Sequence, residues 1–178
     1  MLPAAQTYQV SANGDSGAPL FQDVGTRVLQ TVRLGENAGK LGAGPQNVFA
    51  GYEAGREARS VTQTVCIGYQ AGAATYGTTA AVFIGAFAGA ANQGGSESVF
   101  VGFSAGQTNR YGDTLTAVGA YAMRENYSGS RSTAVGYRAM ERNLNGDDNT
   151  AVGAEAFQGL RSGNRNTATG FRAGRGAQ

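Results

Sequence analysis

The sequence predicts an all-β protein in which nine coils of about 17 residues stack as a parallel β-roll, or β-solenoid. A glycine recurs at intervals of 16 residues once and 17 residues seven times, and an alanine follows each of these glycines three positions later. β-Branched or other apolar residues precede the glycines at alternate positions. Repeats of one fixed length indicate a solenoid in which each unit packs only on its neighbours. The repeat glycines are Gly35, Gly51, Gly68, Gly85, Gly102, Gly119, Gly136, Gly153 and Gly170.

The first element of each coil is a short strand directly before the repeat glycine. Three columns of residues describe it. The entry column is three positions before the glycine: Val32, Val48, Val65, Val82, Val99, Thr116, Thr133, Thr150 and Thr167. The exit column is one position before it: Leu34, Ala50, Ile67, Ile84, Val101, Val118, Val135, Val152 and Thr169. Between them lies the middle column. Apolar residues at a spacing of two predict a strand with one buried face.

The remaining elements of a coil follow from its glycines and polar residues. The repeat glycine predicts a bend, because glycine tolerates positive φ and close backbone approach. We expect a second short strand through the Tyr/Phe-x-Ala segment that follows. The stretches 128–132, 145–149 and 162–166, with sequences SGSRS, NGDDN and SGNRN, are typical of polar turns.

Composition supports a folded protein of this kind. The chain contains 29 Gly but only three Pro, and it lacks the G-X-Y period of collagen. Its hydrophobic fraction of 41% is too high for a disordered linker. Residues 31–178 therefore form the predicted repeat domain, and residues 1–30, which lack the repeat, form a separate segment.

Alternation along the strand leads to a prediction about the two faces. If the entry and exit columns fill the inside, the middle column points outward. An outward apolar stripe on a thin rod is typical of an interface, so we expect self-association through this column. The predicted interface residues are Phe49, Cys66, Phe83, Phe100, Ala117, Ala134, Ala151 and Ala168.

Several segments resemble a known repeat family. SVFVG, STAVG and NTAVG are similar to the signature of trimeric autotransporter adhesin heads, and TVCIGYQAG resembles the NTAVGYQAG repeats of phage tail-fibre and other virion fibre proteins. The resemblance covers residues 31–174. It implies a left-handed β-roll and a homotrimer around a threefold axis.

The resemblance, together with the layout of the chain, suggests a structural protein of the virion surface: a phage fibre or a capsid decoration that aids host attachment. Residues 1–30 would bind other virion proteins. The alternative is the head domain of a bacterial trimeric adhesin on a cell surface. Neither a signal-peptide pattern nor an apolar run of about 18 residues occurs in the chain, so we expect no membrane insertion.

The residue types argue against catalysis. The chain has no His, which excludes Ser-His and Cys-His dyads and His metal sites. Asp147 and Asp148 form the one acidic pair in a turn, whereas calcium-binding rolls need aspartate in every coil. Cys66 is interpreted as a small apolar residue. We expect no enzyme activity, no cofactor and no metal.

Particular residues bear on ice binding, on nucleic-acid binding and on contact with an anionic surface. Thr116, Thr133, Thr150 and Thr167 form a ladder that would suit ice binding if it faced outward, but the alternation predicts that it faces inward. The net charge of +2 is too small to indicate nucleic acid as a partner. An arginine-rich end could contact an anionic host surface glycan, or simply keep an exposed sheet edge soluble. Its residues are Arg161, Arg165, Arg172 and Arg175.

Overall fold

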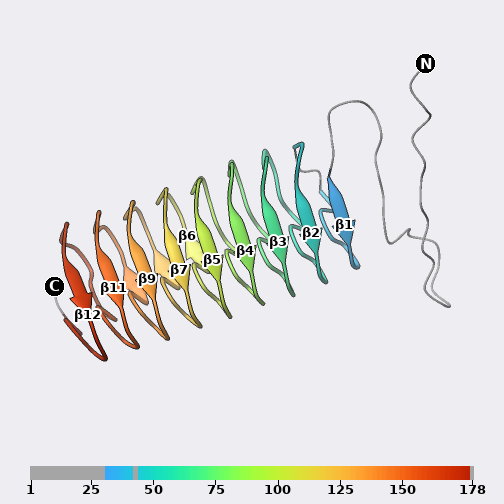
Figure 1. Cartoon of the computed structure of the whole chain (residues 1–178). Helices are drawn as coiled ribbons and strands as arrows, with labels where there is room; N and C mark the ends of the chain where they lie inside the picture. The colour runs from blue at the N-terminus through green and yellow to red at the C-terminus, as the bar shows by residue number, and fades with distance from the viewer. Residues whose placement is uncertain (1–30, 42–43, 177–178) are drawn as a thin grey trace, which may run out of the picture.

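The computed structural model describes residues 31–41 and 44–176. In these residues the chain forms a parallel β-solenoid, and neither α-helix nor antiparallel strand pairing occurs in them. The coils follow one another along a single axis in chain order (Figure 1). The predicted attachment segment, residues 1–30, lies outside the described residues.

A nine-stranded parallel sheet runs along the whole described rod, in the order β1-β2-β3-β4-β5-β7-β9-β11-β12. Consecutive strands pair in register, so that Phe83 of one coil lies beside Phe100 of the next. At about 4.8 Å per strand, the sheet is roughly 40 Å long. Its strands are β1 Val32–Leu34, β2 Val48–Ala50, β3 Val65–Ile67, β4 Val82–Ile84, β5 Val99–Val101, β7 Thr116–Val118, β9 Thr133–Val135, β11 Thr150–Val152 and β12 Thr167–Thr169.

A second, three-stranded parallel sheet lies on another side of the coils. It consists of β6 (Thr108–Asn109), β8 (Glu125–Asn126) and β10 (Arg142–Asn143). Its strands begin six residues after the repeat glycine. The expected second strand in the Tyr/Phe-x-Ala segment is wrong. That segment is a turn, because Gln70 has a φ of 52° and the amide of Ala71 donates to the carbonyl of Gly68 over 3.3 Å.

The repeat glycine is required by both conformation and space. Gly85 has a φ of 126°, which favours glycine. A Cβ atom built on Gly85 would lie 2.6 Å from the carbonyl oxygen of Gly102 in the next coil. The glycine column therefore lets neighbouring coils approach to the strand-pairing distance at the bend.

The faces of the main sheet are the reverse of the sequence expectation. The middle column, expected to point outward, lies inside the coil: Phe49, Cys66, Phe83, Phe100, Ala117, Ala134 and Ala151 have no exposed surface, and Ala168 is 6% exposed. The entry and exit columns are partly or largely exposed instead. The middle column therefore forms the core of a single chain and is not available as an interface.

The middle column is buried because a second column of small side chains lies across the coil from it. Ala54, Ala71 and their equivalents up to Ala156, three residues after each glycine, are fully buried and pack in the same core cluster as the middle column. The next position holds Gly89 opposite Phe83, but Met123 in the coil of Ala117. In most coils a large residue on one side of the interior is thus matched by a small residue on the other, which keeps the core closely packed.

Polar groups inside the coil are paired in a ladder of asparagines. Asn109 donates to Asn92 over 2.8 Å, and Asn126 donates to Asn109 over 2.7 Å. Each of these side chains also donates to the carbonyl of the glycine three residues later, as Asn109 does to Gly112 over 2.7 Å. The ladder satisfies groups that would otherwise be costly to bury. It ends at Asn143, since the next coil has Leu160 at this position.

Candidate functional surfaces

The outward face of the nine-stranded sheet is an apolar surface. Ile67, Ile84, Val118, Val135 and Val152 of the exit column are each between 37% and 40% exposed, and Val101, between Ile84 and Val118, is partly exposed. The entry column runs beside it, with Val32 and Val99 at 40% and 37%. Apolar side chains of the exit column thus line up over eight consecutive strands, from β1 to β11, and an exposed apolar stripe of this kind marks an interaction surface.

Threonines occupy the entry column in the last four coils of this face. Thr116, Thr133 and Thr150 are partly exposed and Thr167 is exposed. The expectation that this ladder points inward is therefore wrong. The middle column, and not the entry column, fills the interior of the coil. Each threonine pairs in register with the next through β7, β9, β11 and β12.

An aromatic ladder follows the bend next to this face, and sequence reasoning did not single it out. Tyr52 and Tyr69 are stacked with ring centroids 5.4 Å apart. The series continues edge to face through Phe87, Phe103, Tyr121 and Tyr137. The signal was an aromatic one or two residues after most repeat glycines. The ladder widens the apolar surface beyond the strands.

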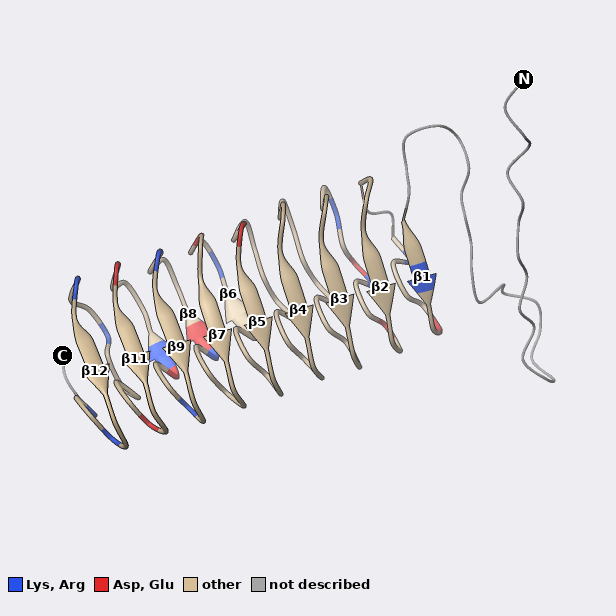
Figure 2. Cartoon of the chain, in the orientation of Figure 1, with Lys and Arg blue, Asp and Glu red and all other residues tan. Residues whose placement is uncertain are grey.

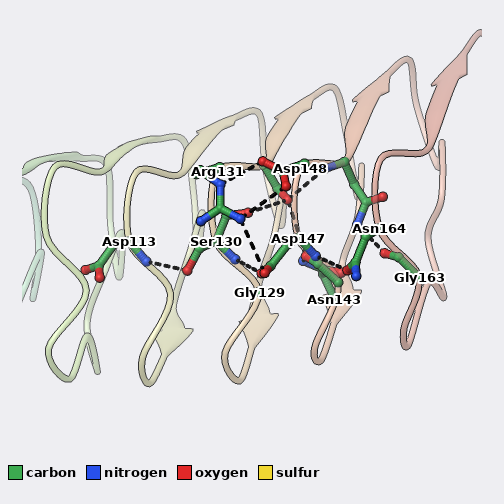
Figure 3. A network of polar contacts seen from close by, with 12 residues as sticks. Asp113, Gly129, Ser130, Arg131, Asn143, Asp147, Asp148, Gly163 and Asn164 are labelled. Atoms are coloured by element: carbon green, nitrogen blue, oxygen red, sulfur yellow. Dashed lines mark hydrogen bonds and ion pairs between the residues drawn. The ribbon is translucent and has the colours of Figure 1, made fainter.

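The polar turns carry a hydrogen-bonded ladder of their own, shown close up in Figure 3. The amide of Asp113 donates to Ser130 over 3.1 Å, and the amide of Ser130 donates to Asp147 over 2.8 Å. Arg131 donates to Asp148 over 2.7 Å. This bond holds the pKa of the Asp148 carboxyl below its ordinary value. The acidic pair is thus engaged with Ser130 and Arg131 as part of the turn.

Cys66 is completely buried among the apolar residues of the core. Burial raises the pKa of its thiol, because the thiolate would be desolvated there. Within the described part of the chain, no group of three His, Cys, Asp or Glu side chains is arranged to hold a metal ion. Nor does that part contain a helix long and apolar enough to cross a membrane.

The structure distributes the four candidate arginines around the last coils. Arg172 and Arg175 bind the Glu155 carboxylate at 2.8 and 3.1 Å. Arg165 belongs to the polar turn, where its charge helps to lower the pKa of Asp148. Arg161 and Arg175 line two neighbouring hollows. The four residues do not form one cluster, and an acid from the preceding coil partly compensates them.

Charge is concentrated in the C-terminal half of the rod. Figure 2 shows Lys, Arg, Asp and Glu in the coils of β1 and β2 and again, in larger number, from β5 to β12, whereas the strands β3 and β4 are free of them. The strands β8 and β10 of the small sheet carry opposite charges side by side, through Glu125 and Arg142. This half of the molecule therefore offers the polar surface, and the nine-stranded sheet offers the apolar one.

Comparison of the chain with models of known protein families, with curated proteins and with solved structures finds no match.

Proposed function

We propose that this protein is a non-enzymatic structural rod that assembles as a homotrimer through the outward face of its nine-stranded sheet. The observation that carries the proposal is the continuous exposed exit column, in which Ile84 and Val118 are typical members. Buried apolar surface is the main driving force for association. The entry column and the aromatic ladder extend the same surface on either side of it.

The proposed setting follows the resemblance of the repeats to virion fibre proteins. In this proposal the coils wind left-handed, three rods lie side by side, and the assembly stands on a virion surface as a fibre or capsid decoration. Residues 1–30 bind other virion proteins, and the rod contacts the host. The alternative setting is a trimeric adhesin head on a bacterial surface, which uses the same assembly.

Sedimentation equilibrium of the full chain at micromolar concentration tests the assembly. The expected mass is three times the 18.2 kDa of one chain. The double variant Ile84→Lys/Val118→Lys places two charges on the outward sheet face and is expected to sediment as one chain, because desolvating an unpaired lysine is costly.

The matched control is Tyr111→Lys/Leu144→Lys. Both of these side chains are exposed and apolar but lie outside the sheet, and the change in charge is the same. The control is expected to remain trimeric. A monomeric wild type, or a trimeric Ile84→Lys/Val118→Lys variant with an unchanged circular dichroism spectrum, would refute the proposed interface.

A second function, ice binding, gains support from the outward threonine ladder. Thr116, Thr133 and Thr150 lie in register on a parallel sheet beside the exit column. The two functions exclude one another, since a sheet face buried in a trimer cannot contact ice. Thermal hysteresis measured on the wild type and on Thr133→Lys distinguishes them. Ice binding requires a hysteresis that this substitution abolishes, together with a monomeric wild type.

A further inference from the structure

A groove near the C-terminal end of the rod lies away from the nine-stranded sheet. Two hollows of about 480 and 410 Å³ make up this arginine groove, and both are lined by Arg142, Gly159 and Gly176. The groove follows the side of the coil that carries β8 and β10. It overlaps the end of the small sheet, because Glu125 of β8 and Arg142 of β10 line it.

Glycines create the groove. Gly159 and Gly176 occupy the position at which the preceding coils carry Glu125 and Arg142. The missing side chains leave the floor open, and a Cβ atom built on Gly159 would meet only the backbone of Gly176, at 3.8 Å. Gly159 is also not among the residues with positive φ. A larger residue at this position can therefore fill the groove without backbone strain.

Arginines from three coils form its walls. Arg124, Arg138, Arg142 and Arg175 line the larger hollow together with a single acid, Glu141. Three coil steps separate Arg124 from Arg175, about 14 Å along the rod. The positive charges of the groove are therefore spread along the rod axis and are not gathered at one point.

Two of these four guanidinium groups, those of Arg138 and Arg142, keep donors for a ligand. Arg124 binds Glu125 at 2.7 Å and Glu141 at 3.3 Å, and Arg175 binds Glu155 at 3.1 Å. Arg142 approaches Glu125 only at 3.5 Å and is 60% exposed in its side chain. The Arg138 side chain is 39% exposed, and its nearest carboxylate, that of Glu141, lies 3.9 Å from its buried Nε, so the exposed end of the guanidinium group is open to a ligand. Arg138 also lies over the rings of Tyr121 and Tyr137, which holds it in place.

The acids in the groove decide what kind of anion fits. Glu141 is nearly buried and binds Arg124 at 3.3 Å and Gln158 at 2.9 Å. Glu125 lies at the edge of the second hollow. A ligand must therefore offer carboxylates or similar groups to the arginines and hydroxyl donors to the glutamates. A DNA duplex presents a line of phosphates but no backbone hydroxyl groups that could donate to these glutamates, whereas a carboxylate-bearing polysaccharide presents both kinds of group.

We propose that the arginine groove binds a carboxylate-bearing polysaccharide. Arg138 and Arg142 pair with successive uronate carboxylates in the bidentate geometry that arginine favours, and Glu125 and Gln158 bind sugar hydroxyls. The proposal deepens the host-attachment part of the proposed function and rests on it, but it does not require the trimer.

Calorimetric titration of the full chain with polygalacturonate tests the groove. The wild type is expected to bind, and the double variant Arg138→Gln/Arg142→Gln to lose at least about tenfold in affinity, as expected for two charge-assisted hydrogen-bonding groups. Gly159→Leu fills the floor without changing the charge and is expected to give a similar loss. The methyl ester of the same polymer is expected not to bind.

The control variant Arg59→Gln/Arg110→Gln removes two arginines that lie over Tyr76 and Tyr127, outside the groove. It is expected to bind as the wild type does. Equal losses in the control and in the groove variant, binding of the methyl ester, unchanged binding by Gly159→Leu, or displacement of the polysaccharide by duplex DNA would each overturn the proposal. Sedimentation of the same variants tests the trimer independently of ligand binding. A wild type that is trimeric but does not bind polygalacturonate would refute the proposed ligand of the groove and leave the proposed trimer standing.

Discussion

The ring of Phe83 occupies the space in which a side chain at Gly89 would have to lie. A Cβ atom built on Gly89 would be 2.7 Å from the Phe83 ring. In the coil of Ala117, the position equivalent to Gly89 is Met123, which is completely buried. Phe49, Phe83 and Phe100 therefore fill the interior from one side in the early coils, and Met123, Met140 and Phe157 fill it from the other side in the later ones.

This exchange predicts a compensating pair of substitutions. Phe100→Ala should destabilise the fold by about 3–5 kcal/mol, because it leaves a cavity. Gly106→Met should also destabilise it, because a Cβ at this position meets the Phe100 ring. The double variant should recover much of the loss, since it copies the Ala117 and Met123 arrangement. Met123 adopts a φ of 47° and Gly106 a φ of 53°, so the backbone already suits the exchange. Urea denaturation of the four proteins measures the coupling, and simple additivity would contradict the packing described.

The buried asparagine ladder predicts a cost for removing one member. Asn109→Ala deletes the donor to Asn92 and the acceptor of Asn126. We expect a loss of about 1–3 kcal/mol in the free energy of unfolding, because buried polar partners are left unsatisfied. Urea denaturation measures it. Asn164→Ala, in an exposed turn, provides the comparison, and an equal or larger loss there would be inconsistent with the ladder.

Acid should weaken the last coils. The hydrogen bond from Arg172 lowers the pKa of the Glu155 carboxyl below its ordinary value of 4.5. A lowered folded-state pKa contributes stability that is present above pH 4.5 and is lost as the pH falls through the folded-state value. Glu155→Gln should therefore be less stable than the wild type at pH 7, and the two proteins should converge in stability as the pH falls below 4.5 and through the lowered folded-state pKa. Thermal melting across this range checks it, with Glu97→Gln as a control. A difference that does not shrink in acid would refute the ion pair's contribution.

The burial of Cys66 predicts that its thiol reacts slowly in the folded protein. The side chain is fully buried and the pKa of the thiol is raised, so the reactive thiolate is scarce. We expect an aromatic disulfide reagent to label the native protein only at the rate of unfolding and to label the protein in urea within minutes. Fast labelling of the native protein would mean that the middle column is exposed, as the sequence alone suggested.

Much of the architecture was predictable from the sequence. The spacing of Gly68, Gly85 and their equivalents determined the coil length and the parallel register, because side chains of one type can stack only if the coils are in phase. The confirmed elements are the nine-stranded sheet, its β-branched strands and the bend at each repeat glycine. The position of the second strand was not predictable, since the turn at Gln70 depends on a left-handed conformation at a residue that is not glycine.

The inner and outer faces were decided only by the tertiary structure. Alternation shows that Phe100 points away from Val99 and Val101, but it is equally compatible with either face being buried. The opposite wall of the coil resolves this choice, because only the middle column meets the alanines and glycines that leave room for an aromatic ring. One coil carries Phe100 with Gly106, and the next carries Ala117 with Met123. This opposite choice of large and small residues can be read from the sequence, but it indicates a shared core only once the two positions are known to face each other. The same holds for the arginine groove: Arg124, Arg142 and Arg175 are up to 51 residues apart in the chain, and it is the stacking of coils that places them along one wall.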